Sequence, residues 1–122
     1  MIDANIPATM DFARIREITL DDTAFQRELL EIYVTDSAER IEKLGKSLNA
    51  GDTNAFRREA HALGGSSGSV GANVIHALSY ALEKTNPSED PGKTKALLDS
   101  IQQSFEQACG LIENYLAALP KE

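Results

Sequence analysis

The sequence predicts an all-α protein: an antiparallel up-down-up-down four-helix bundle with a short additional helix at its N-terminal end. Apolar residues recur every three or four positions through most of the 122 residues, and no stretch alternates apolar and polar residues as a strand does. Short segments rich in turn-forming residues separate the long periodic stretches, so consecutive helices should be antiparallel neighbours. A chain of this length builds one core. We expect a flexible N-terminal lead-in at residues 1–9 and a single helical domain at residues 10–122.

Two helices are expected in the first part of the chain, a short one and then a long one. Helical spacing of apolar residues from Phe12 to Ile18 indicates the short helix. Thr19 and Asp22 have the S/T-x-x-D/E form that opens a new helix, so the long helix should occupy Leu20 to Leu48. Its core-facing positions are expected at Phe25, Leu29, Ile32 or Tyr33, Ser37 or Ala38, Ile41, Leu44 and Leu48.

The third and fourth helices flank a segment rich in glycine and serine, residues 64–71. Gly51 suits the left-handed position at the end of a helix, and Asp52 suits the N-cap of the next one. The third helix should bury Phe56, and the fourth resumes the helical period in residues 74–82.

A loop is expected at residues 86–92, which hold two of the four prolines, and the last helix follows it. The apolar residues of this helix alternate spacings of three and four, as in the seam of a bundle helix. The seam should comprise Leu98, Ile101, Phe105, Ala108, Ile112, Tyr115 and Leu119.

The composition excludes several classes of partner. Twelve basic against nineteen acidic residues give a net charge of −7, which opposes binding to nucleic acid because the phosphate backbone must be neutralised by Lys and Arg. The lone Cys109 has no partner for an internal disulfide, and no apolar run approaches the length of a membrane span. We therefore expect a cytoplasmic monomer that binds neither nucleic acid nor membrane.

Three weaker patterns do not predict a site. Residues 45–47, Gly-Lys-Ser, resemble the end of a phosphate-binding P-loop but lie inside a predicted helix. His61, His76 and Cys109 lack the spacing that places two metal ligands together, so no metal site is expected. Cys109 is expected to serve as a small hydrophobic residue, and His76 as a structural or solvent-facing one.

His61 differs from the other candidates because of its helical neighbours. The residues three, four and seven positions later share its helix face, and all three are glycines: Gly64, Gly65 and Gly68. A glycine inside a helix costs about 1 kcal/mol relative to alanine, which suggests that a partner must approach the imidazole closely. His61 should point away from the core. The alternative is that the glycines only end the third helix.

The chemistry open to this histidine is restricted. No charged residue occurs from Ala60 to Leu82, so a neutral docking surface of small residues is expected around His61. Hydrolysis would need an orienting carboxylate and an oxyanion hole, and neither occurs at a recognisable spacing. A neutral imidazole can instead accept a phosphoryl group reversibly if another protein supplies the metal and the electrostatic stabilisation.

The segment His61-Ala-Leu-Gly-Gly-Ser-Ser-Gly-Ser-Val-Gly71 resembles the His-x-Leu-Lys-Gly-Ser-Ser/Ala-x-x-x-Gly signature of histidine phosphotransfer (HPt) domains of two-component phosphorelays. The resemblance implies that His61 accepts a phosphoryl group from a receiver-domain aspartyl phosphate and passes it to another receiver's aspartate. It implies a phosphorelay intermediate without kinase or hydrolase activity and without a cofactor of its own, with Mg²⁺ on the partner. The implied partners are response-regulator receiver domains, a hybrid sensor histidine kinase, or both.

The resemblance also suggests supporting residues around His61. Gly65 should keep the surface open, and Ser66 and Ser67 should lie about one turn beyond the histidine. Gly64 and Gly68 complete the expected docking surface, and the cations that could reach the phosphoryl group are Arg57, Arg58 and Lys84.

One departure from the signature leaves alternatives open. Gly64 stands where the signature has a lysine, whose charge would contact phosphoryl oxygens. Its absence puts the stability of phosphorylated His61 in question. One alternative is a pseudo-phosphotransfer module that docks on a receiver or kinase without chemistry, and another is an unrelated helical adaptor.

Overall fold

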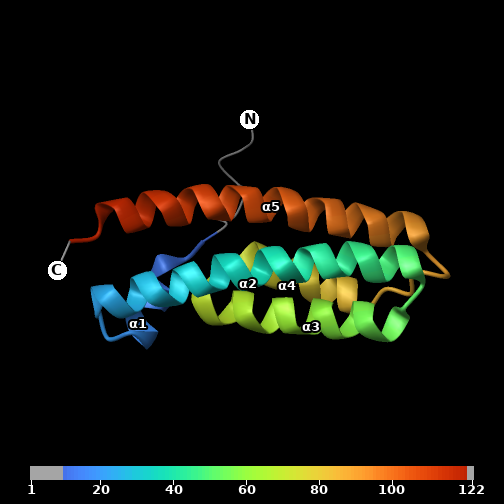
Figure 1. The fold of residues 1–122 in the computed structure, drawn as a ribbon, viewed down its shortest axis with the longest axis horizontal. Coiled ribbons are helices and arrows are strands. Elements are labelled where there is room, and N and C mark those ends of the chain that lie inside the picture. The colour runs from blue at the N-terminus through green and yellow to red at the C-terminus, as the bar shows by residue number, and fades with distance from the viewer. Residues whose placement is uncertain (1–9, 121–122) are drawn as a thin grey trace.

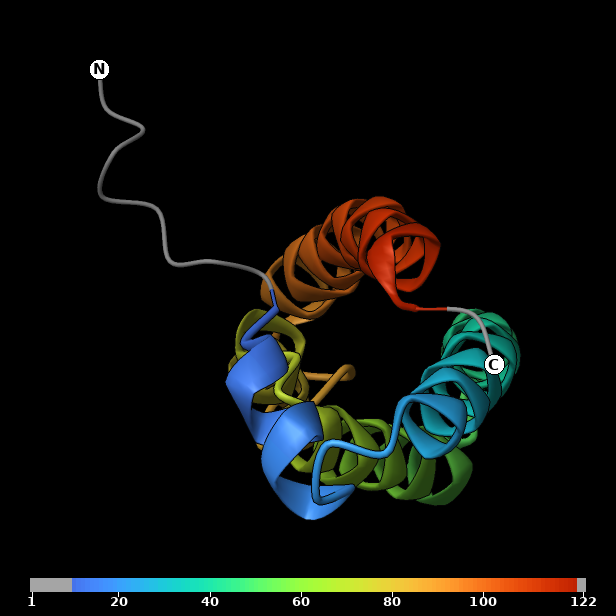
Figure 2. The ribbon, with the colours of Figure 1, turned by 90° about the vertical axis from the view of Figure 1, so that its left-hand side faces the viewer.

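The computed structural model of the protein describes residues 10–120, which form five α-helices and, within that range, no strand. The helices are α1 (Phe12–Ile18), α2 (Thr23–Ala50), α3 (Thr53–Val70), α4 (Asn73–Glu83) and α5 (Pro91–Ala118). Each of α2 to α5 runs back along the one before it (Figure 1), and the four surround a common axis while α1 crosses one end (Figure 2). The predicted fold, an up-down-up-down bundle with a short N-terminal helix, is confirmed.

The turn between α1 and α2 differs from the prediction. Thr19 ends α1 instead of opening α2, and its hydroxyl donates to the carbonyl oxygen of Ile15 at 2.6 Å. Asp22 is the N-cap of α2, and its carboxylate accepts from the Phe25 amide at 3.0 Å. Between them, Leu20 and Asp21 adopt positive φ values of 52° and 63°, so the chain cannot continue as one right-handed helix.

The ends of α2 and α3 follow local sequence chemistry. Gly51 ends α2 with a φ of 73°, and the Asp52 carboxylate caps α3 by accepting from the Ala55 amide at 3.1 Å, both as predicted. Gly64, Gly65 and Gly68 do not end α3. The helix continues to Val70 and ends at Gly71, whose φ of 84° is left-handed.

The core contains side chains from all five helices, and its register on α2 differs from the prediction. Phe25 and Ile32 are 42% and 58% exposed, whereas Gln26 is buried. Gln26 takes this position because its side-chain oxygen accepts from the Tyr115 hydroxyl at 2.6 Å, a contact that apolar periodicity cannot reveal. The large, fully buried apolar side chains are Ile15, Leu30, Leu44, Phe56, Leu63, Ile75, Leu82 and Ile101.

The seam of α5 agrees with the prediction at Leu98, Ile101, Ala108 and Ile112, which are all buried. The loop before this helix spans residues 84–90, two positions earlier than expected, because α4 ends at Glu83 and α5 begins at Pro91. A proline fits the first turn of a helix, where its missing N–H is not needed.

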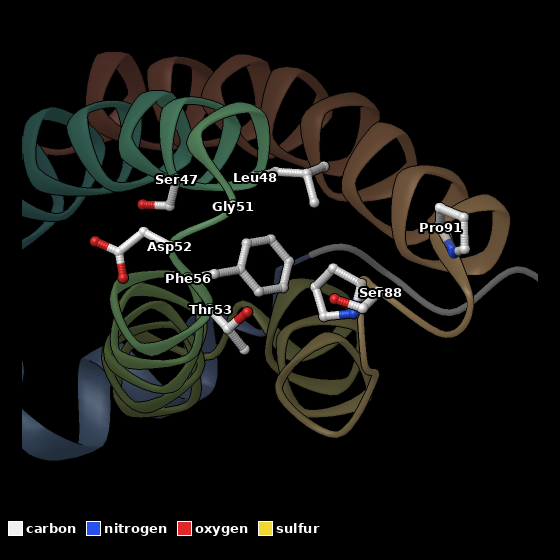
Figure 3. A pocket seen from close by; sticks show the side chains of 9 residues that line it. Ser47, Leu48, Gly51, Asp52, Thr53, Phe56, Ser88 and Pro91 are labelled. Atoms are coloured by element: carbon white, nitrogen blue, oxygen red, sulfur yellow. The ribbon is translucent and has the colours of Figure 1, made fainter.

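The end of the bundle opposite α1 carries a hollow of about 220 Å³. The α2–α3 turn and the α4–α5 loop border it, and the buried Phe56 ring forms part of its wall (Figure 3). None of its lining residues also lines the surface around His61. Within residues 10–120, no helix is long and apolar enough to cross a membrane.

Candidate functional site

His61 lies on the outer face of α3, one residue after the fully buried Ala60. Its side chain is 76% exposed, as the helical spacing predicted. The backbone of α3 is continuous on both sides of it, so the imidazole stands on a rigid element and not on a loop.

Glu83, the last residue of α4, holds the His61 ring. His61 Nδ1 lies 3.1 Å and 3.2 Å from the two carboxylate oxygens of Glu83. A carboxylate only accepts hydrogen bonds, so this contact places the proton on Nδ1 and leaves the lone pair on Nε2. Within residues 10–120, no other group bonds the ring.

No role in the site was assigned to Glu83 from the sequence. It lies 22 positions after His61 and on another helix, so the contact depends on how α4 packs against α3. The available signal was that Glu83 is the first charged residue after the uncharged stretch.

The surroundings of His61 are charged, in contrast to the neutral surface that was expected. A shallow hollow beside the imidazole is lined by Arg40, Arg57, Arg58, Glu59, Ala62 and Glu83. Arg57 and Arg58 were expected at the rim of this surface, but the expectation missed Glu83, which comes from α4, and Arg40, which comes from α2.

The arginines in this hollow differ in how they are held. Arg40 is 2.9 Å from a carboxylate oxygen of Asp36 and 3.0 Å from one of Glu59. Burial opposes its charge, but the hydrogen bonds to Asp36 and Glu59 outweigh that effect and raise the pKa of Arg40. Arg57 and Arg58 are exposed and form no ion pair within residues 10–120. They are the cations available to an anion on His61.

Lys84, the third cation suggested by the sequence, is directed elsewhere. Its Nζ lies 4.3 Å from the centre of the Tyr80 ring, a cation–π contact on the surface of α4. It does not line the hollow beside His61.

The three glycines near His61 do not share one role. A Cβ on Gly65 would meet nothing within 4 Å, so this glycine leaves the surface beside His61 open. Gly64 is buried, and a Cβ there would lie 3.4 Å from the Ser79 Cβ of α4. A Cβ on Gly68 would lie 2.9 Å from His76 Nδ1. Only Gly65 uncovers the histidine, whereas the other two allow α4 to approach α3.

The two serines after the glycines are also separated. Ser67 is fully buried, and its hydroxyl lies 2.7 Å from the Tyr33 hydroxyl of α2, so it cannot touch a docking partner. Ser66 is half-buried and donates to the Leu63 carbonyl oxygen at 3.2 Å. Both serines therefore bond groups of this chain.

The remaining candidate metal ligands do not lie close together. Within the described part of the chain, no three His, Cys, Asp or Glu side chains lie close enough to hold a metal ion. Cys109 is half-buried on α5, where burial and the nearby Glu106 and Glu113 raise the pKa of its thiol. His76 makes a 2.7 Å hydrogen bond with the Gly64 carbonyl oxygen.

Comparison with known proteins agrees with this geometry. The model of the Hpt domain family matches residues 28–121. The chain belongs to the Hpt domain family. Hpt domains are phosphorelay intermediates that interact with receiver domains and kinases of two-component systems.

The Hpt fold is also found in a solved structure. The crystal structure of histidine-containing phosphotransfer protein B (HptB) from Pseudomonas aeruginosa PAO1 superposes with a TM-score of 0.84. The match covers 94% of this chain and 100% of that one at 23% sequence identity, and it shows the shared fold. No curated protein sequence matches the chain significantly.

Proposed function

We propose that His61 is the phosphoacceptor of this Hpt domain, taking a phosphoryl group from a receiver-domain aspartyl phosphate and passing it to the aspartate of another receiver. One observation carries the proposal: the imidazole is 76% exposed, and its Nδ1 is held by Glu83. This arrangement presents the lone pair of Nε2 to a partner.

The transfer needs no group on this chain beyond the held imidazole and nearby cations. The Nε2 lone pair attacks phosphorus, the N–P bond forms, the P–O bond to the receiver aspartate breaks, and the aspartate leaves as a carboxylate. The ring keeps its Nδ1 proton and becomes positively charged, and the Glu83 carboxylate stabilises that charge. Attack by another aspartate on phosphorus reverses these bond changes and restores the neutral ring.

We infer that the receiver supplies the rest of the active site. The surface beside His61 is a shallow hollow, and the cations free to contact phosphoryl oxygens there are Arg57 and Arg58. The Mg²⁺ that neutralises the transferring group belongs on the partner, and this chain then needs no cofactor. The proposed role is that of a phosphorelay intermediate, with no kinase or hydrolase activity of its own.

The proposal is tested with a receiver domain carrying labelled phosphate and with the variant His61→Gln. Wild-type protein should take up the label, and the variant should take up none while keeping its helical circular dichroism and its affinity for the receiver. Label on the variant would show that His61 is not the acceptor.

One observation favours a docking module without phosphotransfer. Gly64 replaces the lysine of the signature and is buried, so this position offers no cation to a phosphoryl group. That function predicts binding of the wild-type protein to receivers with no label on His61. Arg57 and Arg58 beside the imidazole support active transfer instead.

A further inference from the structure

A second histidine joins the same two helices one turn further along α3. His76 lies in the first turn of α4, and its Nδ1 is 2.7 Å from the Gly64 carbonyl oxygen of α3. A carbonyl oxygen only accepts hydrogen bonds, so His76 Nδ1 is the donor. We propose that His76 is a positioning residue that sets α4 against α3 so that Glu83 reaches His61, an inference that rests on the proposed phosphoacceptor.

The missing side chain of Gly68 makes this contact possible. A Cβ at that position would lie 2.9 Å from Nδ1 and 3.2 Å from Cε1 of His76, so the imidazole occupies the space that any other residue would fill. Gly64, one turn earlier, similarly brings α3 close to the Ser79 Cβ. The two glycines thus form a flat strip on which α4 rests.

The contacts follow one another in order along the antiparallel pair. Gly68 faces His76, Gly64 faces Ser79, and His61 faces Glu83. A slide of α4 by one residue would move it about 1.5 Å along its axis. Such a slide would change the His61–Glu83 distances of 3.1 Å and 3.2 Å, so the contact that holds the tautomer of His61 depends on this register.

The N-terminal end of α4 has no side-chain cap. Its N-cap is Ala72, which makes no side-chain capping bond, whereas an aspartate caps each of the other four helices. The His76 side chain makes a polar contact from this first turn, and it bonds the Gly64 carbonyl oxygen of α3 instead of the backbone of α4. A bond between helices restrains the position of α4 in a way that a capping bond within the helix does not.

The first experiment compares His76→Ala with His76→Asn, whose side-chain amide places an N–H where Nδ1 stands. Nitrogen-15 NMR of the imidazoles reports the tautomer of His61, and labelled receiver phosphate reports transfer. His76→Ala should shift His61 toward the Nε2–H tautomer and slow transfer on the order of 10-fold. His76→Asn should restore most of the Nδ1–H tautomer of His61 and most of the transfer rate. Asn73→Ala, at an exposed position in the same turn, should change neither the tautomer nor the rate.

A second experiment uses Gly68→Ala, alone and combined with His76→Ala. The single variant should displace His76 and slow transfer as His76→Ala does, and the double variant should be no slower than His76→Ala alone. An unchanged His61 tautomer in His76→Ala would overturn the inference, even if the melting temperature falls. If wild-type His61 takes no label, the proposed function fails, but the tautomer still tests the positioning role separately.

Discussion

At the scale of single residues, a carboxylate decides which nitrogen of His61 carries a proton. Free histidine in water favours the tautomer with the proton on Nε2, which leaves Nε2 without a lone pair. Glu83 reverses this preference by accepting from Nδ1 at 3.1 Å and 3.2 Å. On the proposed function, the same contact would stabilise the charged ring after phosphorylation, so Glu83 should act on both the rate of transfer and the lifetime of the product.

Replacing Glu83 separates its acceptor oxygen from its charge. Glu83→Gln keeps an oxygen that can accept from Nδ1 but removes the charge, whereas Glu83→Ala removes both. We expect transfer from a labelled receiver to slow in the order wild type, Gln, Ala, with about 10-fold between wild type and Ala. Equal rates in all three proteins would show that the carboxylate does not position the imidazole.

At the scale of elements, α3 contains helix-interior glycines for two different purposes. Gly64 and Gly68 bring α4 close, whereas Gly65 faces solvent and a Cβ there would meet nothing within 4 Å. Each interior glycine costs about 1 kcal/mol relative to alanine. No packing within the described chain offsets this cost at Gly65, so access for a docking partner is the remaining explanation.

This explanation predicts opposite effects on stability and function. Gly65→Ala should raise the free energy of unfolding by about 0.5–1 kcal/mol in urea titration, and it should also slow phosphotransfer from a receiver. Gly110→Ala is the matched control, because Gly110 is an exposed residue inside α5 and a Cβ there also meets nothing within 4 Å. It should stabilise the protein equally and leave transfer unchanged. Unimpaired transfer in Gly65→Ala would remove the case for a docking role.

At the scale of the whole molecule, polar contacts inside the bundle join helices that the apolar core alone would allow to slide. Tyr33 of α2 bonds Ser67 of α3 at 2.7 Å, and Tyr115 of α5 bonds Gln26 of α2 at 2.6 Å. Burial raises the pKa of Tyr33 despite its hydrogen bond to Ser67, so this phenol stays neutral in the folded protein. Such directional bonds select one helix register, because a shifted register would leave buried hydroxyls unpaired.

Tyr33→Phe tests this role. The variant leaves the Ser67 hydroxyl without its partner in the core and should lose about 1–2 kcal/mol in urea unfolding at pH 7. Because the folded pKa is raised, the contribution of Tyr33 is fully present below the unfolded pKa of about 10 and is lost as the pH rises through the folded pKa. The difference in the free energy of unfolding between wild type and Tyr33→Phe should therefore narrow above pH 10. Tyr80→Phe, at an exposed tyrosine, should have the same free energy of unfolding as wild type. If Tyr33→Phe were also as stable as wild type, the Tyr33–Ser67 bond would not stabilise the bundle.

Local sequence determined most of the fold. Helical periodicity located the helices, Gly51 and Asp52 marked one boundary, and helical spacing from Phe56 placed the His61 side chain outside the core. These features depend on residues within two turns of each other, so spacing along the chain suffices to predict them. The resemblance around His61 correctly indicated the family.

The sequence by itself thus determined the bundle, the outward histidine and the Hpt family, whereas the tertiary structure decided what surrounds that histidine. Glu83 reaches His61 from α4, and Gly64 and Gly68 face α4. On α2, Gln26 is buried in place of the expected Phe25. Each of these depends on the distance and register between helices, which arise from packing of side chains far apart in the chain. Periodicity shows which face of a helix is buried, but it does not show which residue of another helix lies opposite.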